Sequence, residues 1–187
     1  MIVTLVVIAV IVVLALMLFG TYNRLVALRQ SANQAFADID VQLQQRHDLI
    51  PNLVETVKGY ATHERGTLEA VTNARAAASS ARSVDEKVQA ENMLTGALRQ
   101  LFAVAEAYPD LKANTNFLQL QSELSDIENK LAAARRFFNN AVGEFNAAIQ
   151  QFPAVLLAGA LGFRERAFFD VGENRASLNT APQVSFS

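Results

Sequence analysis

The chain opens with an unbroken apolar segment, Ile2–Phe19, which contains one threonine and no charged residue. As a helix this segment spans roughly 27 Å, close to the thickness of the hydrocarbon core of a bilayer. Tyr22 follows where an interfacial aromatic residue is expected. A cleaved signal peptide is the alternative, but it has an apolar core of about 7–15 residues after a basic start, and "LMLFGTY" lacks an A-x-A cleavage pattern. The pattern therefore predicts an uncleaved transmembrane anchor over residues 1–21.

Beyond residue 22, apolar side chains recur every three or four residues, which is the period of a helix. They are Leu25, Leu28, Ala32, Ala35, Ile39 and Leu43, and beyond Pro51 they are Leu53, Val57, Tyr60, Leu68 and Val71. The stretch "ARAAASSARS", residues 74–83, loses large apolar residues and is expected to be a fraying helix end and a loop. The chain from Leu25 to Val71 is thus predicted to be mostly helical, with Pro51 inside the pattern.

Pro51 admits two paths for the chain. In the first, the chain reverses near residues 48–50 and a new helix begins at the proline, which is tolerated in a first helical turn. In the second, one kinked helix continues from Tyr22 to about Ser79, although an internal proline costs about 3 kcal/mol. The apolar phase continues across Pro51 without a polar loop, which favours the second path. We expect a helix that is broken or strongly kinked at Pro51, and a kinked continuous helix is the alternative.

Two more helices are predicted downstream. Ser83 and Glu86 form the S-x-x-E pattern of a capping box, and the helix after them is expected to end near Tyr108–Pro109. After the turn "PDLKANTN", Asn116 resembles a second cap. In the last helix the apolar residues alternate steps of three and four over four heptads, which is typical of a bundle core. These residues are Phe117, Leu120, Leu124, Ile127, Leu131, Ala134, Phe138, Ala141, Phe145 and Ala148.

The resulting fold prediction is all-α. One N-terminal transmembrane helix is followed by an antiparallel up-and-down bundle over residues 22–151, with three long helices that count as four because of the break at Pro51. Residues 152–171 form an apolar post-bundle segment that is too short to cross a bilayer, and residues 172–187 form a polar tail. The apolar segment is expected to be a lid on the bundle end. A contact with a partner or a membrane surface is the alternative, for which Phe163, Phe168 and Phe169 are the candidate interaction residues.

Composition and motifs narrow the function. A net charge of −2 and a pI near 5.7 give no electrostatic case for nucleic-acid binding. Cysteine is absent, and the only histidines, His47 and His63, lack the Glu-x-x-His and H-E-x-x-H spacings of metal sites. The chain has no phosphate-binding loop and no nucleophile elbow. We therefore predict no cofactor, no metal, no catalytic residue and no enzymatic activity.

The stretch "RHD", Arg46, His47 and Asp48, lies just before Pro51. Adjacent residues of a helix point in different directions, so they are poor ligands for a single atom. A solvated corner is therefore expected, and a charged site beside a hinge is the alternative. Arg46, His47, Asp48 and Pro51 are retained as candidate hinge or interaction residues.

Four stretches resemble the LemA family of bacterial proteins. They are "FADIDVQLQQRHDLIPNLVETVKGYATHE", "LRQLFAVAEAYPDLKANTNFLQLQSEL", "ENKLAAARRFFNNAVGEFN" and "GFRERAFFDV". The resemblance covers nearly the whole chain after the anchor. It implies one membrane helix followed by a four-helix antiparallel bundle on the cytoplasmic side, and it supplies no biochemical activity. Members are often encoded beside membrane proteases or other envelope proteins, which implies partners of those kinds.

The orientation and the function are predicted on this basis. Arg24 and Arg29 follow the apolar segment and no basic side chain precedes it, so the positive-inside rule places the bundle in the cytoplasm. We expect an adaptor or scaffold at the bacterial inner membrane, anchored in the lipid bilayer through Ile2–Phe19 and acting on unidentified protein partners. Two alternatives are a structural homo-oligomer built through the Tyr22–Leu49 helix and an unrecognised enzyme with a carboxylate or Arg–His–Asp site.

Overall fold

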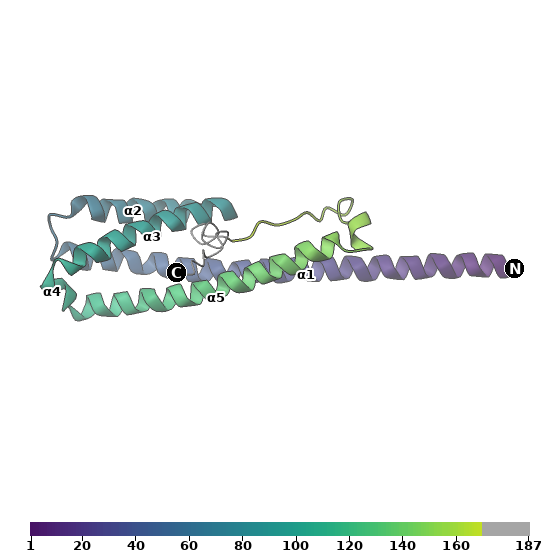
Figure 1. The fold of residues 1–187 in the computed structure, drawn as a ribbon, viewed down its shortest axis with the longest axis horizontal. Helices are drawn as coiled ribbons and strands as arrows, with labels where there is room; N and C mark the ends of the chain where they lie inside the picture. The colour runs from purple at the N-terminus through teal and green to yellow at the C-terminus, as the bar shows by residue number, and fades with distance from the viewer. Residues whose placement is uncertain (170–187) are drawn as a thin grey trace, which may run out of the picture. The chain divides into compact units, whose positions relative to one another are not determined.

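The computed structural model describes residues 1–169, and the predicted tail over residues 172–187 lies outside them. Figure 1 shows that the described chain contains helices and no strands, which confirms the all-α prediction. The elements are α1 (Ile2–Lys58), α2 (Arg65–Ser80), α3 (Val84–Glu106), α4 (Pro109–Lys112), α5 (Thr115–Gln150) and the 3-10 helix η1 (Ala154–Leu156). They form two compact units. The first contains Met1–Val41 and Lys130–Phe168, and the second contains Gln42–Asn129 together with Phe169.

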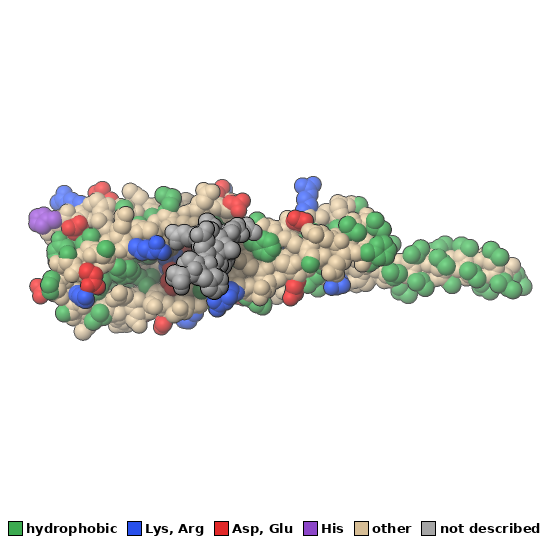
Figure 2. All heavy atoms as spheres, viewed as in Figure 1, with side chains coloured by type: hydrophobic (Ala, Val, Ile, Leu, Met, Phe, Trp, Pro, Cys, Tyr) green, Lys and Arg blue, Asp and Glu red, His purple; other side chains and the backbone are tan. Residues whose placement is uncertain are grey.

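The first unit contains the predicted anchor. The apolar start of α1 is long enough to cross a membrane, and no part of it is buried within the chain. Leu5 and Phe19 are 67% and 68% exposed, and Figure 2 shows apolar side chains around this part of the helix. Apolar side chains exposed on all sides of a helix are stable in lipid and unfavourable in water. The structure therefore contains one candidate membrane span at its N-terminus.

After this span, α1 packs against the second half of α5 within the first unit. The rings of Phe36 and Phe138 lie 5.4 Å apart, and Leu25 shares a core cluster with Phe145 and Ala148. Because residue numbers rise along α1 as they fall along α5, the two helices are antiparallel in this unit. The heptad pattern of α5 also predicted its buried side, where Leu131, Phe138 and Phe145 are almost fully buried.

The second unit contains the end of α1, then α2, α3, α4 and the start of α5, around one hydrophobic core. The turn over residues 81–83 reverses the chain between α2 and α3, which pack along each other. The helix end and loop predicted over residues 74–83 are both present, but α2 continues as regular helix to Ser80 and the loop is confined to residues 81–83. Ala74 and Ala78 are buried, which shows that small side chains allow close helix packing here.

Two polar caps organise the later helices of the second unit. The capping box of α3 is confirmed, because Ser83 accepts from the backbone N–H of Glu86 and the Glu86 carboxylate accepts from the backbone N–H of Ser83. Backbone N–H donors, first that of Arg82 and then that of Ser83, lower the pKa of Glu86. The cap predicted at Asn116 is wrong by two residues, since the Asn114 Oδ1 atom accepts from the backbone N–H of Phe117 at 3.0 Å.

The chain does not reverse at Pro51. Pro51 lies inside α1, and the helix continues for seven more residues to Lys58, so the path through a reversal near residues 48–50 is wrong. The alternative is also corrected at its far end, because the chain turns between Gly59 and Glu64 rather than near Ser79. Gly59 supplies the helix end that the apolar pattern concealed, since glycine has the lowest helix propensity after proline.

Candidate functional site: a buried polar network

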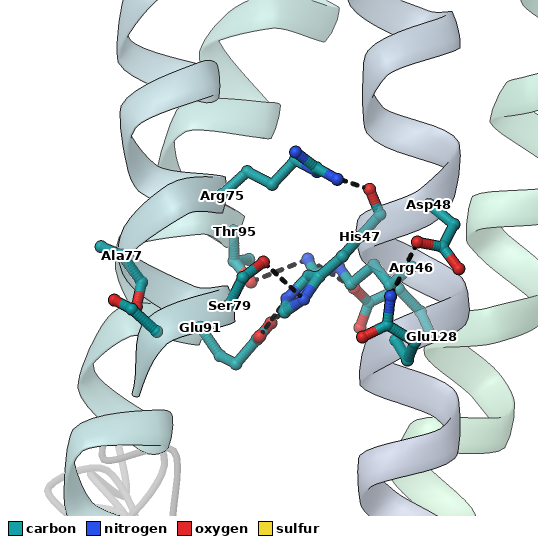
Figure 3. A network of polar contacts seen from close by, with 11 residues as sticks. Arg46, His47, Asp48, Arg75, Ala77, Ser79, Glu91, Thr95 and Glu128 are labelled. Carbon is teal, nitrogen blue, oxygen red and sulfur yellow. Dashed lines mark hydrogen bonds and ion pairs between the residues drawn. The ribbon is translucent and has the colours of Figure 1, made fainter. Parts of the chain in front are cut away.

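The carboxylate of Glu91, in the second unit, makes two polar contacts with α1. The Glu91 side chain on α3 is almost fully buried, and its two oxygens bind two adjacent residues of α1. The Arg46 Nη1 atom donates to Glu91 Oε2 at 2.8 Å, and the His47 Nε2 atom lies 2.6 Å from Glu91 Oε1. Figure 3 shows both side chains reaching from α1 towards Glu91. Because the carboxylate has two oxygens with several lone pairs, it can accept from both neighbours at once.

His47 is held on both sides of its ring. An ionised carboxylate only accepts hydrogen bonds, so this contact is a hydrogen bond when the His47 Nε2 atom carries the ring proton. On the other side of the ring, the Ser79 Oγ atom on α2 lies 3.2 Å from His47 Nδ1. The imidazole therefore bridges α2 and α3 from its position on α1, and its exposed fraction is only 4%.

Arg46 extends the network to α5. Its Nη2 atom donates to Thr95 Oγ1 at 3.0 Å and lies 2.6 Å from Glu128 Oε1. The Arg46 side chain is 2% exposed, whereas that of Glu128 is 41% exposed. Arg46 thus binds α3 and the start of α5 with one planar guanidinium, which suits arginine better than lysine.

Pro51 leaves a specific backbone carbonyl without its helical partner. In a regular α-helix the N–H of residue 51 would donate to the carbonyl of His47, four residues earlier, and proline has no N–H. In this structure the Arg75 Nε atom on α2 donates to that His47 carbonyl at 2.7 Å (Figure 3). A charged donor from a neighbouring helix replaces the missing bond, which explains how α1 continues through the proline.

The expectation of a solvated corner is wrong for Arg46 and His47 and correct for Asp48. Arg46 and His47 are buried, while Asp48 is exposed and accepts only a bond from Gln44 at 2.8 Å within α1. The expectation assumed that adjacent residues cannot share a ligand. They share one here because long side chains converge on a bidentate carboxylate.

Glu91 was not among the residues predicted from the sequence, although its position in the apolar pattern of α3 is a signal. Glu91 lies three residues after Val88 and three before Leu94, at a position where the pattern of α3 calls for an apolar side chain. Arg46 likewise lies in phase between Leu43 and Ile50. A charged residue at a core position of each of two helices predicts a buried pair, because an unpaired buried charge is too costly to persist.

Two of the open grooves in the described part of the second unit contain charged side chains. One, of about 280 Å³, is lined by polar Arg46, Thr95, Arg99, Gln121, Ser125 and Glu128 and by apolar Leu98, Phe102 and Leu124. The other, of about 590 Å³, lies where α1 ends and α2 begins, with Val54, Lys58, Arg65 and Leu68 in its lining. The first groove includes Arg46 and the carboxylate of Glu128, and the second includes the carboxylates of Glu55 and Glu69, whereas Asp48, His63 and Glu106 line neither of them. Within residues 1–169, no group of three His, Cys, Asp or Glu side chains is placed to hold a metal ion.

The three candidate phenylalanines of the C-terminal segment differ in exposure. Phe163 and Phe169 are buried, with exposed fractions of 3% and 1%, whereas Phe168 is 44% exposed. Phe163 joins the core cluster of the first unit, and Phe168 lies beside Gly143 of α5. Phe163 therefore fixes the segment to the bundle and offers no surface to a partner. A role for these residues in interaction stays a prediction.

Helices that lead from one candidate membrane span into a bundle place the chain among single-span helical-bundle proteins. A comparison with known families is more specific, because residues 35–186 match the LemA family, and the chain belongs to that family. Magnetosome protein MamQ of Magnetospirillum gryphiswaldense is 22% identical, over 79% of this chain and 64% of its own length. Protein LemA of Metamycoplasma hominis is 28% identical, over 87% of this chain and 75% of its own length. The chain thus spans less than two thirds of the MamQ relative.

Glu91→Ala tests the network as a stabilising element. The substitution leaves His47 without its acceptor and Arg46 with only Thr95 and the half-exposed Glu128, so we expect a loss of about 3 kcal/mol of unfolding free energy. Glu55→Ala is the control, because its pair with Lys58 is exposed and contributes about 0–1 kcal/mol. Urea unfolding of both variants in detergent, followed by circular dichroism, measures the difference. Equal losses in the two variants would show that the buried network is energetically unimportant.

Arg75→Met tests how the helix continues through Pro51. In the native chain the change leaves the His47 carbonyl without this charged donor, and we expect a loss of about 1.5–3 kcal/mol. In a Pro51→Ala background a backbone N–H can bind the same carbonyl, so the loss from Arg75→Met should shrink by about 1 kcal/mol. The same unfolding measurement on the four chains gives the coupling energy. Strict additivity would contradict the proposed exchange of one donor for the other.

Proposed function

We propose that this protein is a membrane-anchored adaptor or scaffold of the bacterial inner membrane, which acts through contacts with other proteins. The observation that carries this proposal is the continuity of α1, which leads from the apolar span into the bundle as one helix. A bundle attached in this way is held at the membrane without a flexible linker. Its side chains are then available to other proteins at the same membrane.

The polar groups of the second unit support a structural role for the network. His47 and Glu91 are the pair best suited to acid–base chemistry, and neither lines the two grooves. They bind each other at 2.6 Å, and both are almost fully excluded from solvent. A general base has to reach a substrate proton, directly or through one water. The names of the LemA and MamQ relatives also state no catalytic activity.

The partners that we propose are membrane proteases or other envelope proteins, as the LemA resemblance implies. The groove lined by Leu98, Phe102 and Leu124 suits a protein segment, because its lining also includes the charged side chains of Arg99 and Glu128. The alternative of a homo-oligomer built through the Tyr22–Leu49 helix has less support. The apolar side of that helix, including Leu25 and Ile39, is buried within the chain itself.

The sidedness of the bundle is tested with one cysteine. The chain has none, and Lys130 is exposed on α5, so Lys130→Cys introduces a single accessible thiol. We expect that a thiol reagent that cannot cross the inner membrane leaves intact cells unlabelled and labels the protein after lysis, because Arg24 and Arg29 keep their side of the span in the cytoplasm. Labelling in intact cells would place the bundle on the outer side and contradict the proposed orientation.

Photo-crosslinking in cells tests the protein contact. A photoreactive amino acid in place of Gln121 lies in the groove, and the same group in place of Asp126 lies on an exposed part of the same helix outside it. We expect a discrete adduct with another membrane protein from the first position and none from the second. An adduct only with a second copy of the chain would support the homo-oligomer instead. Equal adducts from both positions would contradict a specific contact in the groove.

A further inference from the structure

The segment after α5 orients its side chains in an unusual way. Its small residues Ala154 and Ala158 face the core of the first unit, together with Phe163. Its large apolar residues are exposed instead, by 75% at Phe152 and 71% at Leu156, with Val155 and Leu161 exposed by 52% and 44%. A lid that served only to cover the bundle would direct its larger side chains inward, because burial of large apolar area is what stabilises such a contact.

This segment lies beside the end of the candidate span. The Phe163 ring packs against Tyr22 with ring centroids 5.9 Å apart, and Leu25 belongs to the same cluster. Tyr22 is three residues beyond Phe19, which corresponds to about 4.5 Å along a helix axis, and Leu25 is about 9 Å beyond Phe19. The interfacial layer of a bilayer extends roughly 5–8 Å beyond its hydrocarbon core. The segment is therefore at the level of α1 where lipid headgroups begin, and Figure 2 shows apolar side chains gathered there beside the span.

Side-chain hydrogen bonds attach the end of this segment to α1 and α5. The Asn146 side chain makes two hydrogen bonds with the backbone of Arg166, at 2.9 and 3.0 Å, and the Arg166 side chain donates to Asn33 Oδ1 at 2.6 Å. Gly162 turns the chain at a φ of 76°, which favours glycine. The exposed apolar side chains are thus presented by a loop that is attached to the bundle, which lowers the entropic cost of inserting them into another phase.

Basic side chains accompany the apolar ones. The Arg29 guanidinium lies 5.0 Å from the centre of the Phe163 ring, and Arg24 and Arg164 are exposed in the same unit. Apolar side chains combined with arginines at the level of the headgroups are typical of interfacial membrane contacts, because the apolar groups enter the acyl boundary and the cations meet anionic phospholipids.

We infer that the loop from Phe152 to Leu161, named here the interfacial loop, inserts into the headgroup region of the same bilayer leaflet from which α1 emerges. The occupant of the exposed apolar surface is lipid, since that surface is continuous with the candidate span through Tyr22 and Phe163. The loop would act as a second contact with the membrane and limit rotation and tilt of α1. The inference rests on the proposed anchoring by Ile2–Phe19, and the experiment separates the two.

Single tryptophans report the environment of the loop, because the chain contains no tryptophan. The full chain is reconstituted in phosphatidylcholine–phosphatidylglycerol vesicles with brominated acyl chains, which quench only tryptophans that contact lipid. Leu156→Trp and Phe152→Trp probe the loop, and Phe19→Trp probes the span. Phe137→Trp is the matched control, since Phe137 is 56% exposed on α5 and lies about 20 Å before Gln150 along the helix. Circular dichroism confirms that each variant keeps its helical content.

We expect bromine to quench both loop tryptophans and the span tryptophan, with emission shifted to shorter wavelength. Phe137→Trp should keep its emission in brominated vesicles and be quenched by aqueous iodide. If the span tryptophan is quenched and both loop tryptophans respond only to iodide, the loop inference is wrong and the anchor stands. If the loop tryptophans resist both quenchers, protein covers the loop and the inference is also wrong. If the span tryptophan itself responds only to iodide, the anchor fails, and the loop inference fails with it.

Discussion

The alignment of helices in the second unit depends on the hydrogen bonds of one buried carboxylate, that of Glu91. Glu91 on α3 binds two consecutive residues of α1, and each of those residues continues to another helix, His47 to Ser79 on α2 and Arg46 to Glu128 on α5. Four helices are thus connected through polar side chains that are mostly buried. The removal of any central member leaves a buried charge or donor without its partner, so the network is formed as a whole or costs stability.

Such a network need not add stability relative to an apolar core, and its value is better sought in specificity. Apolar helices that repeat every three and four residues can slide by one heptad with little change in burial, since leucines and alanines replace one another. A buried Arg–His–Glu arrangement has only one register in which the Glu91 carboxylate meets both Arg46 and His47. We infer that the network fixes how α1, α2 and α3 align, because a polar group at a core position is the best-attested way to select a register.

The sequence was informative where a local rule decides the structure. The heptads of α5, the capping box at Ser83 and the apolar span all follow from the spacing of residues in one segment, and the structure contains each of them. The path at Pro51 could not be predicted in this way. The His47 carbonyl that the proline leaves unpaired is bound by Arg75, a residue of α2 that is distant in sequence. Pro51 does remove one backbone hydrogen bond from α1, as expected, but the bond from Arg75 to the His47 carbonyl offsets this loss.

The same limit explains why the polar site was misjudged. Within α1 alone, adjacent charged residues such as Arg46 and His47 are expected to face solvent. Their burial is explained only by Glu91 of α3, which binds both of them. Arg46 occupies an apolar phase of α1, Glu91 occupies an apolar phase of α3, and Pro51 lies one turn after His47. Each residue alone breaks a rule of helix design. Together these departures compensate one another. Arg46 and Glu91 neutralise each other's charge, and Arg75 of α2 binds the carbonyl that Pro51 leaves without a helical donor. These residues are unfavourable within a single helix, but they are explained by the contacts that they make between helices.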